Sequence, residues 1–223
     1  MINISILSTI PSGVTLVAVT KTLPASSILQ AYRAGIRNFG ENYVEEFEEK
    51  YAQLPDEVKK NATFHMIGHV QGRKAKKVAA LFDWVDSVDS MELAQKLDTA
   101  AGSVQKKLHV LFQINISGEK TKYGFQNSHI VIHENFRFHN LIIEGLMTMP
   151  PAVVHSEDNR GVFRSLKILS ETLRKKYSAL GSVVSMGTSQ DYQVAIAEGA
   201  TMVRLGTVIF GKRPQKIAKI GLE

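Results

Sequence analysis

The sequence contains no cysteine. This absence excludes disulfide bonds, thiolate zinc sites, cysteine-ligated iron–sulfur clusters and cysteine nucleophiles. No segment reaches the roughly 18 consecutive apolar residues that a membrane-spanning helix needs, so we expect no membrane association. The apolar stretch over residues 1–10 lacks basic flanking residues and a small-residue cleavage pattern, and we therefore expect no signal peptide and a cytoplasmic protein.

No sign of charge dominates the composition. Lys and Arg number 27 against 21 Asp and Glu, and a net charge of +6 does not by itself indicate a nucleic-acid-binding protein. Two basic runs, residues 74–77 and 174–176, carry no interleaved aromatic residues and are typical of solvated helix faces, so we expect no nucleic-acid partner. The 223 residues fit one domain, and we expect a monomer with a single domain over 1–223.

Short apolar runs alternate with longer stretches of helical periodicity. The runs are rich in Val, Ile and Phe and nearly continuous, which is typical of strands buried on both faces. They cover residues 14–20, 36–39, 64–67, 84–88, 108–116, 141–147, 182–186 and 202–205.

Helical periodicity fills most of the connections between these runs. The predicted helices cover residues 26–34, 41–53, 74–82, 90–101, 161–179 and 192–198, with Ser90 as an N-cap. Eight strand–helix units in about 220 residues predict a (β/α)₈ barrel near its lower size limit. An open doubly wound sheet is the alternative, because periodicity does not show whether a sheet closes.

Lys21 follows the first strand and is the candidate nucleophile. In such a barrel the active face lies at the carboxyl ends of the strands. A lysine flanked there by protein loses solvation, which lowers its pKa, and a neutral amine can form a Schiff base with an aldehyde. The alternative is a lysine at a strand end that simply reaches solvent.

Two polar turns follow the last two predicted strands. Residues 185–189 precede a helix, and Arg204, Gly206 and Thr207 end the eighth strand. Barrels often bind phosphate after strands seven and eight, although ordinary turns use the same residue types. An aldehyde-reactive amine beside a phosphate site suggests pyridoxal phosphate (PLP). Arg204 could then face the pyridine nitrogen and keep it unprotonated, which makes the ring a weaker electron sink.

Six motifs in order resemble those of the pyridoxal phosphate homeostasis protein family, the single-domain relatives of the alanine racemase barrel. They are Val17–Lys21, Phe39–Asn42, His65–Gln71, Gly145–Met149, Ser185–Ser189 and Arg204–Gly211. The sequence departs from the usual pattern at residues 72–74, at Thr188, and in having only thirteen residues before Val14.

The resemblance implies a (β/α)₈ barrel that carries PLP on Lys21, with no metal and no assigned catalytic residue. The implied roles are phosphate contacts from Ser185, Gly187, Gly206 and Thr207, Arg204 at the ring nitrogen, Asn42 beside the cofactor, and His65 and Met186 lining the pocket. The family is usually described as holding PLP, delivering it and balancing its pools. The implied recipients are the apo forms of PLP-dependent enzymes.

A weakly active, racemase-like enzyme is the alternative function. Racemisation needs an acid or base on each face of the ring, and Lys21 can serve only one face. In alanine racemases the second group is a tyrosine, and a β-rich domain completes the enzyme. Tyr43, Tyr123 or Tyr192 could approach the mouth of the barrel, but the sequence stops soon after the eighth strand. We therefore expect a non-catalytic carrier.

Overall fold

The strands that the structure describes all run parallel, and eight of them form one closed sheet. The computed structural model describes residues 2–119, 122–126 and 138–212. Its strands are β1 Thr15–Val19, β2 Asn38–Glu41, β3 Thr63–Met66, β4 Trp84–Val88, β5 Leu108–Asn115, β6 Phe125–Gln126, β7 Leu141–Met147, β8 Val183–Thr188 and β9 Met202–Leu205. The short β6 was not predicted, because two residues are too few to show a periodicity.

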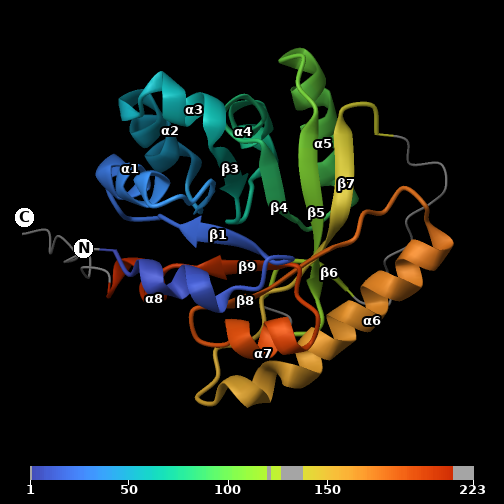
Figure 1. Ribbon diagram of the computed structural model, residues 1–223. Coiled ribbons are helices and arrows are strands. Elements are labelled where there is room, and N and C mark those ends of the chain that lie inside the picture. The colour runs from blue at the N-terminus through green and yellow to red at the C-terminus, as the bar shows by residue number, and fades with distance from the viewer. Residues whose placement is uncertain (1, 120–121, 127–137, 213–223) are drawn as a thin grey trace, which may run out of the picture.

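Strand pairing closes the barrel. The order β4-β3-β2-β1-β9-β8-β7-β5 has a further pairing between β4 and β5, which joins the two ends of the sheet. Trp84 pairs with His109 across this last junction, and β6 is added at the outer end of β5. The closure confirms the (β/α)₈ barrel and rules out the open sheet (Figure 1).

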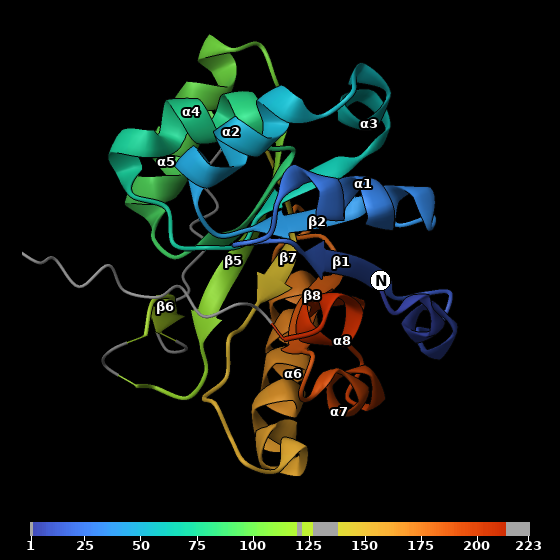
Figure 2. The same ribbon diagram turned by 90° about the vertical axis from the view of Figure 1, so that its left-hand side faces the viewer.

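Helices surround the strands on the outside of the barrel. The α-helices are α1 Ala25–Arg33, α2 Val44–Gln53, α3 Asp56–Asn61, α4 Ala75–Leu81, α5 Met91–Ser103, α6 Arg160–Lys176, α7 Tyr192–Ala197 and α8 Thr207–Phe210. Three short 3₁₀ helices, η1 Ile4–Thr9, η2 Gly72–Lys74 and η4 Ser156–Asn159, complete the described elements. Figure 2 shows α2, α4 and α5 on one side of the strands and α6, α7 and α8 on the other. No described helix has the length and apolarity needed to cross a membrane.

Each predicted helix is present within a few residues of its expected bounds. The Ser90 cap is confirmed, because the Leu93 backbone N–H donates to Ser90 Oγ at 3.2 Å. The helices α3 and α8 and the segment η1 were not predicted, and each has at most six residues. So short an element depends on tertiary packing more than on its own periodicity.

The core has two layers. Outside the barrel, Phe47 of α2 packs between Phe64 of β3 and Phe82, with ring centroids 4.9 and 4.6 Å apart. Inside the barrel, a smaller apolar cluster of Val17, Leu111, Met147 and Met202 fills the middle.

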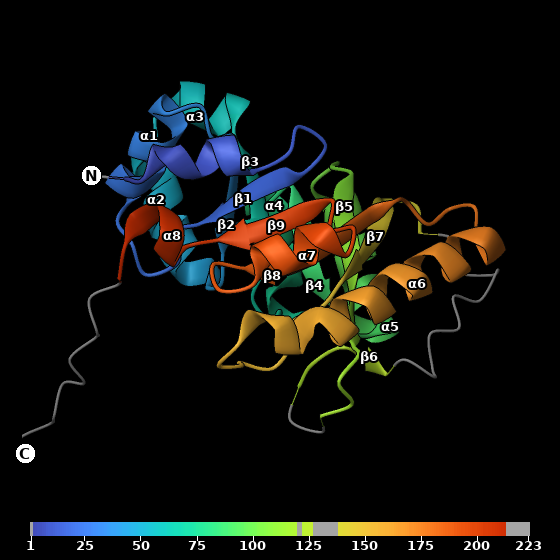
Figure 3. The ribbon, with the colours of Figure 1, turned by 60° about the horizontal axis from the view of Figure 1, so that its bottom comes forward.

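The N-terminal segment packs against the last described helix. Asn3 N donates to Ile209 O at 2.8 Å, and Asn3 Nδ2 donates to Val208 O at 3.2 Å. Figure 3 shows η1 lying against α8. Asn3 is thus bonded to the helix that directly follows Gly206.

Candidate functional site

A cavity of about 300 Å³ opens at the carboxyl ends of the strands. It is lined by Val19, Lys21, Asn42, Ile67, Met149, Thr188, Ser189, Gln190, Arg204, Gly206 and Thr207. These residues follow or end β1, β2, β3, β7, β8 and β9, so strands far apart in sequence contribute to one wall. Its size lies at the lower end of the range of roughly 300–1,000 Å³ for small-molecule sites.

Lys21 stands at the rim of this cavity, two residues beyond the end of β1. Its strand is flanked on both sides, since Ala18 pairs with Phe39 of β2 and with Leu205 of β9. The side chain is half-buried. Lys21 and Asn42, which follow the neighbouring strands β1 and β2, therefore both line the cavity, and Lys21 is partly desolvated.

Arg204 forms part of the cavity wall, and only 3% of its surface is exposed. Its Nη1 donates to Ser185 Oγ at 2.5 Å, and its Nη2 donates to the Thr148 carbonyl at 2.9 Å and to Met149 Sδ at 3.0 Å. All three bonded groups are neutral. Burial lowers the pKa of Arg204, while the nearby carboxylate of Asp86 acts in the opposite direction. The guanidinium is thus held in a fixed orientation by neutral acceptors.

Backbone N–H groups converge at the β8–β9 side of the cavity. The N–H groups of Gly206 and Val208 both donate to Ser189 Oγ, at 3.0 and 3.4 Å. Asp191 Oδ1 accepts from the Thr188 N–H at 2.7 Å and from the Thr188 hydroxyl at 3.0 Å. The two turns are therefore fixed, and N–H groups that converge on one oxygen form an arrangement suited to an anion.

The other predicted site residues lie behind this lining. Ser185 is fully buried and accepts the hydrogen bond from Arg204. Met186 packs in the layer between the sheet and the helices. At Gly187 the φ angle is +90°, and an added Cβ would lie 2.6 Å from Ala195 Cβ, so glycine allows α7 to approach β8 closely. A direct ligand contact for these residues stays a prediction.

His65 lies deeper inside the barrel. It is fully buried on β3, with Nδ1 3.0 Å from Asp86 Oδ1 and Nε2 3.2 Å from Asn38 Oδ1. Its ring stacks on Trp84 at a centroid distance of 5.1 Å. Ile67, two residues further along the chain, is the residue that reaches the cavity.

Several residues that line the cavity were not predicted from the sequence, among them Ile67, Met149 and Gln190. Ser189 belongs to the same hydroxyl-rich run as Ser185, so the composition of that run already indicated that its later residues could line the site. Gln190 continues the run, whereas Met149 reads as an ordinary core residue.

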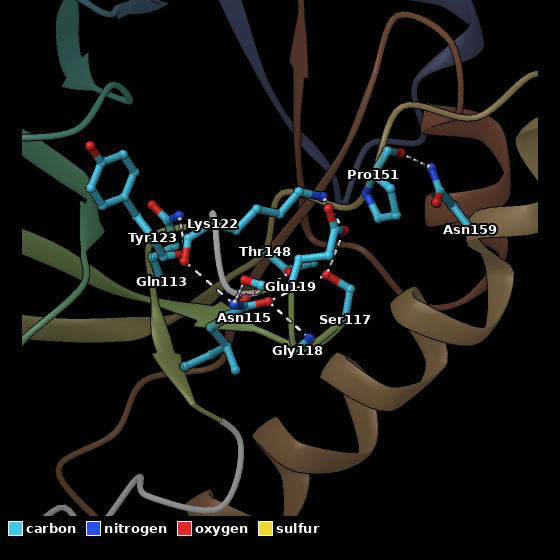
Figure 4. Close-up of polar contacts among 11 residues, drawn as sticks. Gln113, Asn115, Ser117, Gly118, Glu119, Lys122, Tyr123, Thr148, Pro151 and Asn159 are labelled. Carbon is cyan, nitrogen blue, oxygen red and sulfur yellow. Dashed lines mark hydrogen bonds and ion pairs between the residues drawn. The ribbon is translucent and has the colours of Figure 1, made fainter.

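The rim on the β5 side is fixed by amide side chains (Figure 4). Asn115 Nδ2 donates to the Glu119 carbonyl at 2.8 Å, and Asn115 Oδ1 accepts the Gly118 N–H at 3.0 Å. Gln113 Nε2 donates to the Tyr123 carbonyl at 2.9 Å. In the described residues, these hydrogen bonds therefore hold the segment after β5 in place at the mouth of the barrel.

The three candidate tyrosines are not among the residues that line the described cavity. Tyr123 stacks on His69 at 3.8 Å between ring centroids, and Tyr43 is exposed. Tyr192 is buried, with its hydroxyl 3.3 Å from Thr9 Oγ1 of η1. The described structure thus presents none of these hydroxyls to the cavity that holds Lys21.

Comparisons with known proteins agree with this geometry. The family model of the alanine racemase N-terminal domain matches residues 2–214. A pyridoxal phosphate homeostasis protein of Vibrio alginolyticus is 40% identical over 206 residues, covering 91% of this chain and 88% of the relative. The chain belongs to the pyridoxal phosphate homeostasis protein family.

Solved structures place the fold in the same family. PipY of Synechococcus elongatus PCC7942, solved with PLP bound, matches with a TM-score of 0.84 and 34% identity, over 93% of this chain and 97% of that chain. An alanine racemase of Clostridium difficile 630 matches with a TM-score of 0.70 at 18% identity, over 95% of this chain and 56% of that chain. This second likeness shows the shared barrel alone.

Proposed function

We propose that the chain binds PLP in the cavity at the barrel mouth and holds it as a Schiff base on Lys21. The observation that carries the proposal is that Lys21, Arg204, Gly206 and Thr207 line one cavity. In this reaction the Lys21 amine forms a C=N bond with the aldehyde carbon of PLP, and one water molecule leaves. The family membership and the bound PLP of the PipY structure support the same ligand.

The residues of the cavity fit this cofactor in three respects. Lys21 supplies a partly desolvated amine at the rim. The N–H groups of Gly206 and Val208 converge on the Ser189 hydroxyl oxygen, and a phosphate that takes over these donors would displace that hydroxyl. Arg204 supplies a buried cation whose orientation is set by Ser185 and Thr148. We assign the ring nitrogen to Arg204, the phosphate to the turns around Gly206 and Thr207, and the flank of the cofactor to Asn42.

We further propose that the chain is a carrier that takes part in PLP homeostasis and hands the cofactor to apo-enzymes. PLP acts in enzymes as an electron sink, and a cationic partner at the ring nitrogen weakens that property. Racemisation also needs a second acid or base opposite Lys21. None of the three candidate tyrosines lines the described cavity, which supports the non-catalytic role.

The test is a visible spectrum with chemical trapping. Wild type mixed with PLP is expected to show a Schiff-base absorbance band, and borohydride is expected to fix the label on the Lys21 peptide. Lys21→Ala is expected to lose both signals, whereas Lys76→Ala, a control at an exposed lysine, is expected to keep them. Label on another lysine would reject the assignment. Turnover of an amino acid by the loaded protein would instead favour the racemase-like alternative.

A further inference from the structure

Both chain neighbours of Lys21 are bound by carboxylates from the β2–α2 segment. Thr20 Oγ1 donates to Glu41 Oε1 at 2.7 Å, and the Thr22 backbone N–H donates to Glu46 Oε1 at 2.5 Å. Glu41 ends β2, and Glu46 lies in the first turn of α2. Lys21 therefore sits between two hydrogen-bonded anchor points.

A buried lysine joins the two carboxylates. Lys50 Nζ lies 2.8 and 3.0 Å from the two Glu41 oxygens and 2.6 Å from Glu46 Oε1. The same ammonium donates to the Thr20 carbonyl at 2.8 Å. One network of Glu41, Glu46 and Lys50 thus contacts the side chain and the carbonyl of Thr20 and the N–H of Thr22.

This network is expensive to bury. Glu41 is fully buried and Lys50 is 5% exposed. Burial raises the pKa of Glu41, and the ammonium of Lys50 acts against that shift. An apolar cluster of similar volume is often at least as stabilising as a buried ion pair. Stability alone therefore does not explain the network, and its contacts with Thr20 and Thr22 on either side of Lys21 offer a better explanation.

The segment that the network holds has an unusual backbone. Thr22 has a φ of +62°, in the left-handed region that a threonine rarely adopts. Such a conformation persists only where its surroundings enforce it, and such residues cluster at functional sites. The bond from the Thr22 N–H to Glu46 supplies that constraint directly after Lys21.

We propose that Glu41, Glu46 and Lys50 are positioning residues that orient Lys21 toward the cavity for Schiff-base formation. The inference rests on the proposed function of Lys21. By fixing Thr20 and Thr22, the network orders the turn before PLP arrives, so that binding does not have to order it. Orientation of a reacting group in advance is a major source of rate acceleration.

The first test compares two substitutions of Glu46, which is only partly buried. The measured quantity is the rate constant for growth of the Schiff-base band after the PLP-free chain is mixed with PLP. Glu46→Ala removes the acceptor of the Thr22 N–H and is expected to lower the rate constant by about tenfold. Glu46→Gln keeps an amide oxygen as acceptor and is expected to stay within about threefold of wild type. Glu49→Ala, at an exposed position of the same helix, is expected to match wild type.

A second pair tests the other anchor and replaces the first if Glu46→Ala does not fold. Thr20→Val keeps the shape but removes the hydroxyl that binds Glu41, and it is expected to slow Schiff-base formation. Thr20→Ser restores the hydroxyl and is expected to restore the rate. Circular dichroism at the assay temperature identifies the folded variants. A purely structural role would change the unfolding temperature and leave the rate constant of the folded protein unchanged.

The outcomes separate the two proposals. Borohydride label on Lys21 of wild type, with unchanged rate constants in folded Glu46→Ala and Thr20→Val, would overturn the positioning role alone. Absence of label on Lys21 of wild type would overturn the proposed function and the positioning role with it. Slower Schiff-base formation in Glu46→Ala and Thr20→Val, restored in Glu46→Gln and Thr20→Ser, would support both proposals.

Discussion

Arg204 and Ser185 are joined across two neighbouring parallel strands by a hydrogen bond of 2.5 Å from Nη1 to Oγ. The serine hydroxyl is fully buried and is one of three neutral groups that orient the guanidinium. The wall of the cavity therefore depends on a residue that does not itself line it.

Removal of the Ser185 hydroxyl is expected to destabilise the protein. Ser185→Ala leaves a buried cation without one acceptor, which costs about 1.5–3 kcal/mol. Urea denaturation checks the loss, with Ser103→Ala as the control. Ser103 is an exposed residue whose hydroxyl donates to the carbonyl of Ala100 in its own helix, so a change within about 0.5 kcal/mol is expected there. Equal stability of the two variants would contradict the role given to Ser185.

Reversal of the charge at residue 204 is expected to change the protonation of bound PLP. Arg204→Glu replaces a cation with an acceptor, which favours a protonated ring nitrogen. The absorbance spectrum of the loaded protein, recorded across pH, is expected to shift relative to wild type. Arg204→Gln, which removes the charge only, is expected to lie between the two. An unchanged spectrum in both variants would show that Arg204 is not the neighbour of the ring.

Stability is expected to depend on pH through Glu198. Its two oxygens accept from Arg160 and Arg164, at 2.5 and 3.0 Å, and these hydrogen bonds lower the pKa of the carboxyl. A lowered pKa means that the stabilisation is present above the ordinary glutamate value and is lost as pH falls through the folded value. Glu198→Gln is therefore expected to be less stable than wild type at pH 7 and to approach it in acid. Urea midpoints between pH 7 and pH 3 measure this, with the exposed Glu49→Gln as control. A gap that stays constant with pH would contradict the prediction.

A side chain at residue 187 is expected to disturb the β8 side of the cavity. Its φ is +90°, and an added Cβ would approach Tyr192 Cα to 2.9 Å as well as Ala195. Gly187→Ala is expected to cost about 2 kcal/mol or more through backbone strain and overpacking. At Gly161 an added Cβ meets nothing within 4 Å, so Gly161→Ala is the matched control and is expected to be neutral or stabilising. Denaturation of both variants in urea decides the comparison.

The sequence predicts the strands well, because buried parallel strands are continuous apolar runs with clear ends. It also predicts that Lys21, Arg204 and Gly206 lie near one another, since all three end strands at the same face of the barrel. The closed barrel was predicted from the number of strand–helix units alone, because the segments β4 and β5 that pair to close it do not specify each other in their own patterns.

Depth within the barrel was the harder property to predict. Successive side chains of a strand face opposite sides, so Ser185 points inward while Met186 packs against the helices. His65 points inward as well, but Ile67, two residues later on the same side of the strand, is the residue that reaches the cavity. His65 lies deeper and bonds to Asp86. The contacts of Glu41 and Lys50 with Thr20 were not visible in the sequence, because they join residues from three separate elements.

The attachment of Asn3 to α8 has a practical consequence for handling the protein. Any affinity tag or fusion partner placed ahead of Asn3 begins next to the helix that follows Gly206. Ligand affinities measured with such an extension therefore need to be repeated after its proteolytic removal. A tag on the opposite terminus offers the independent comparison.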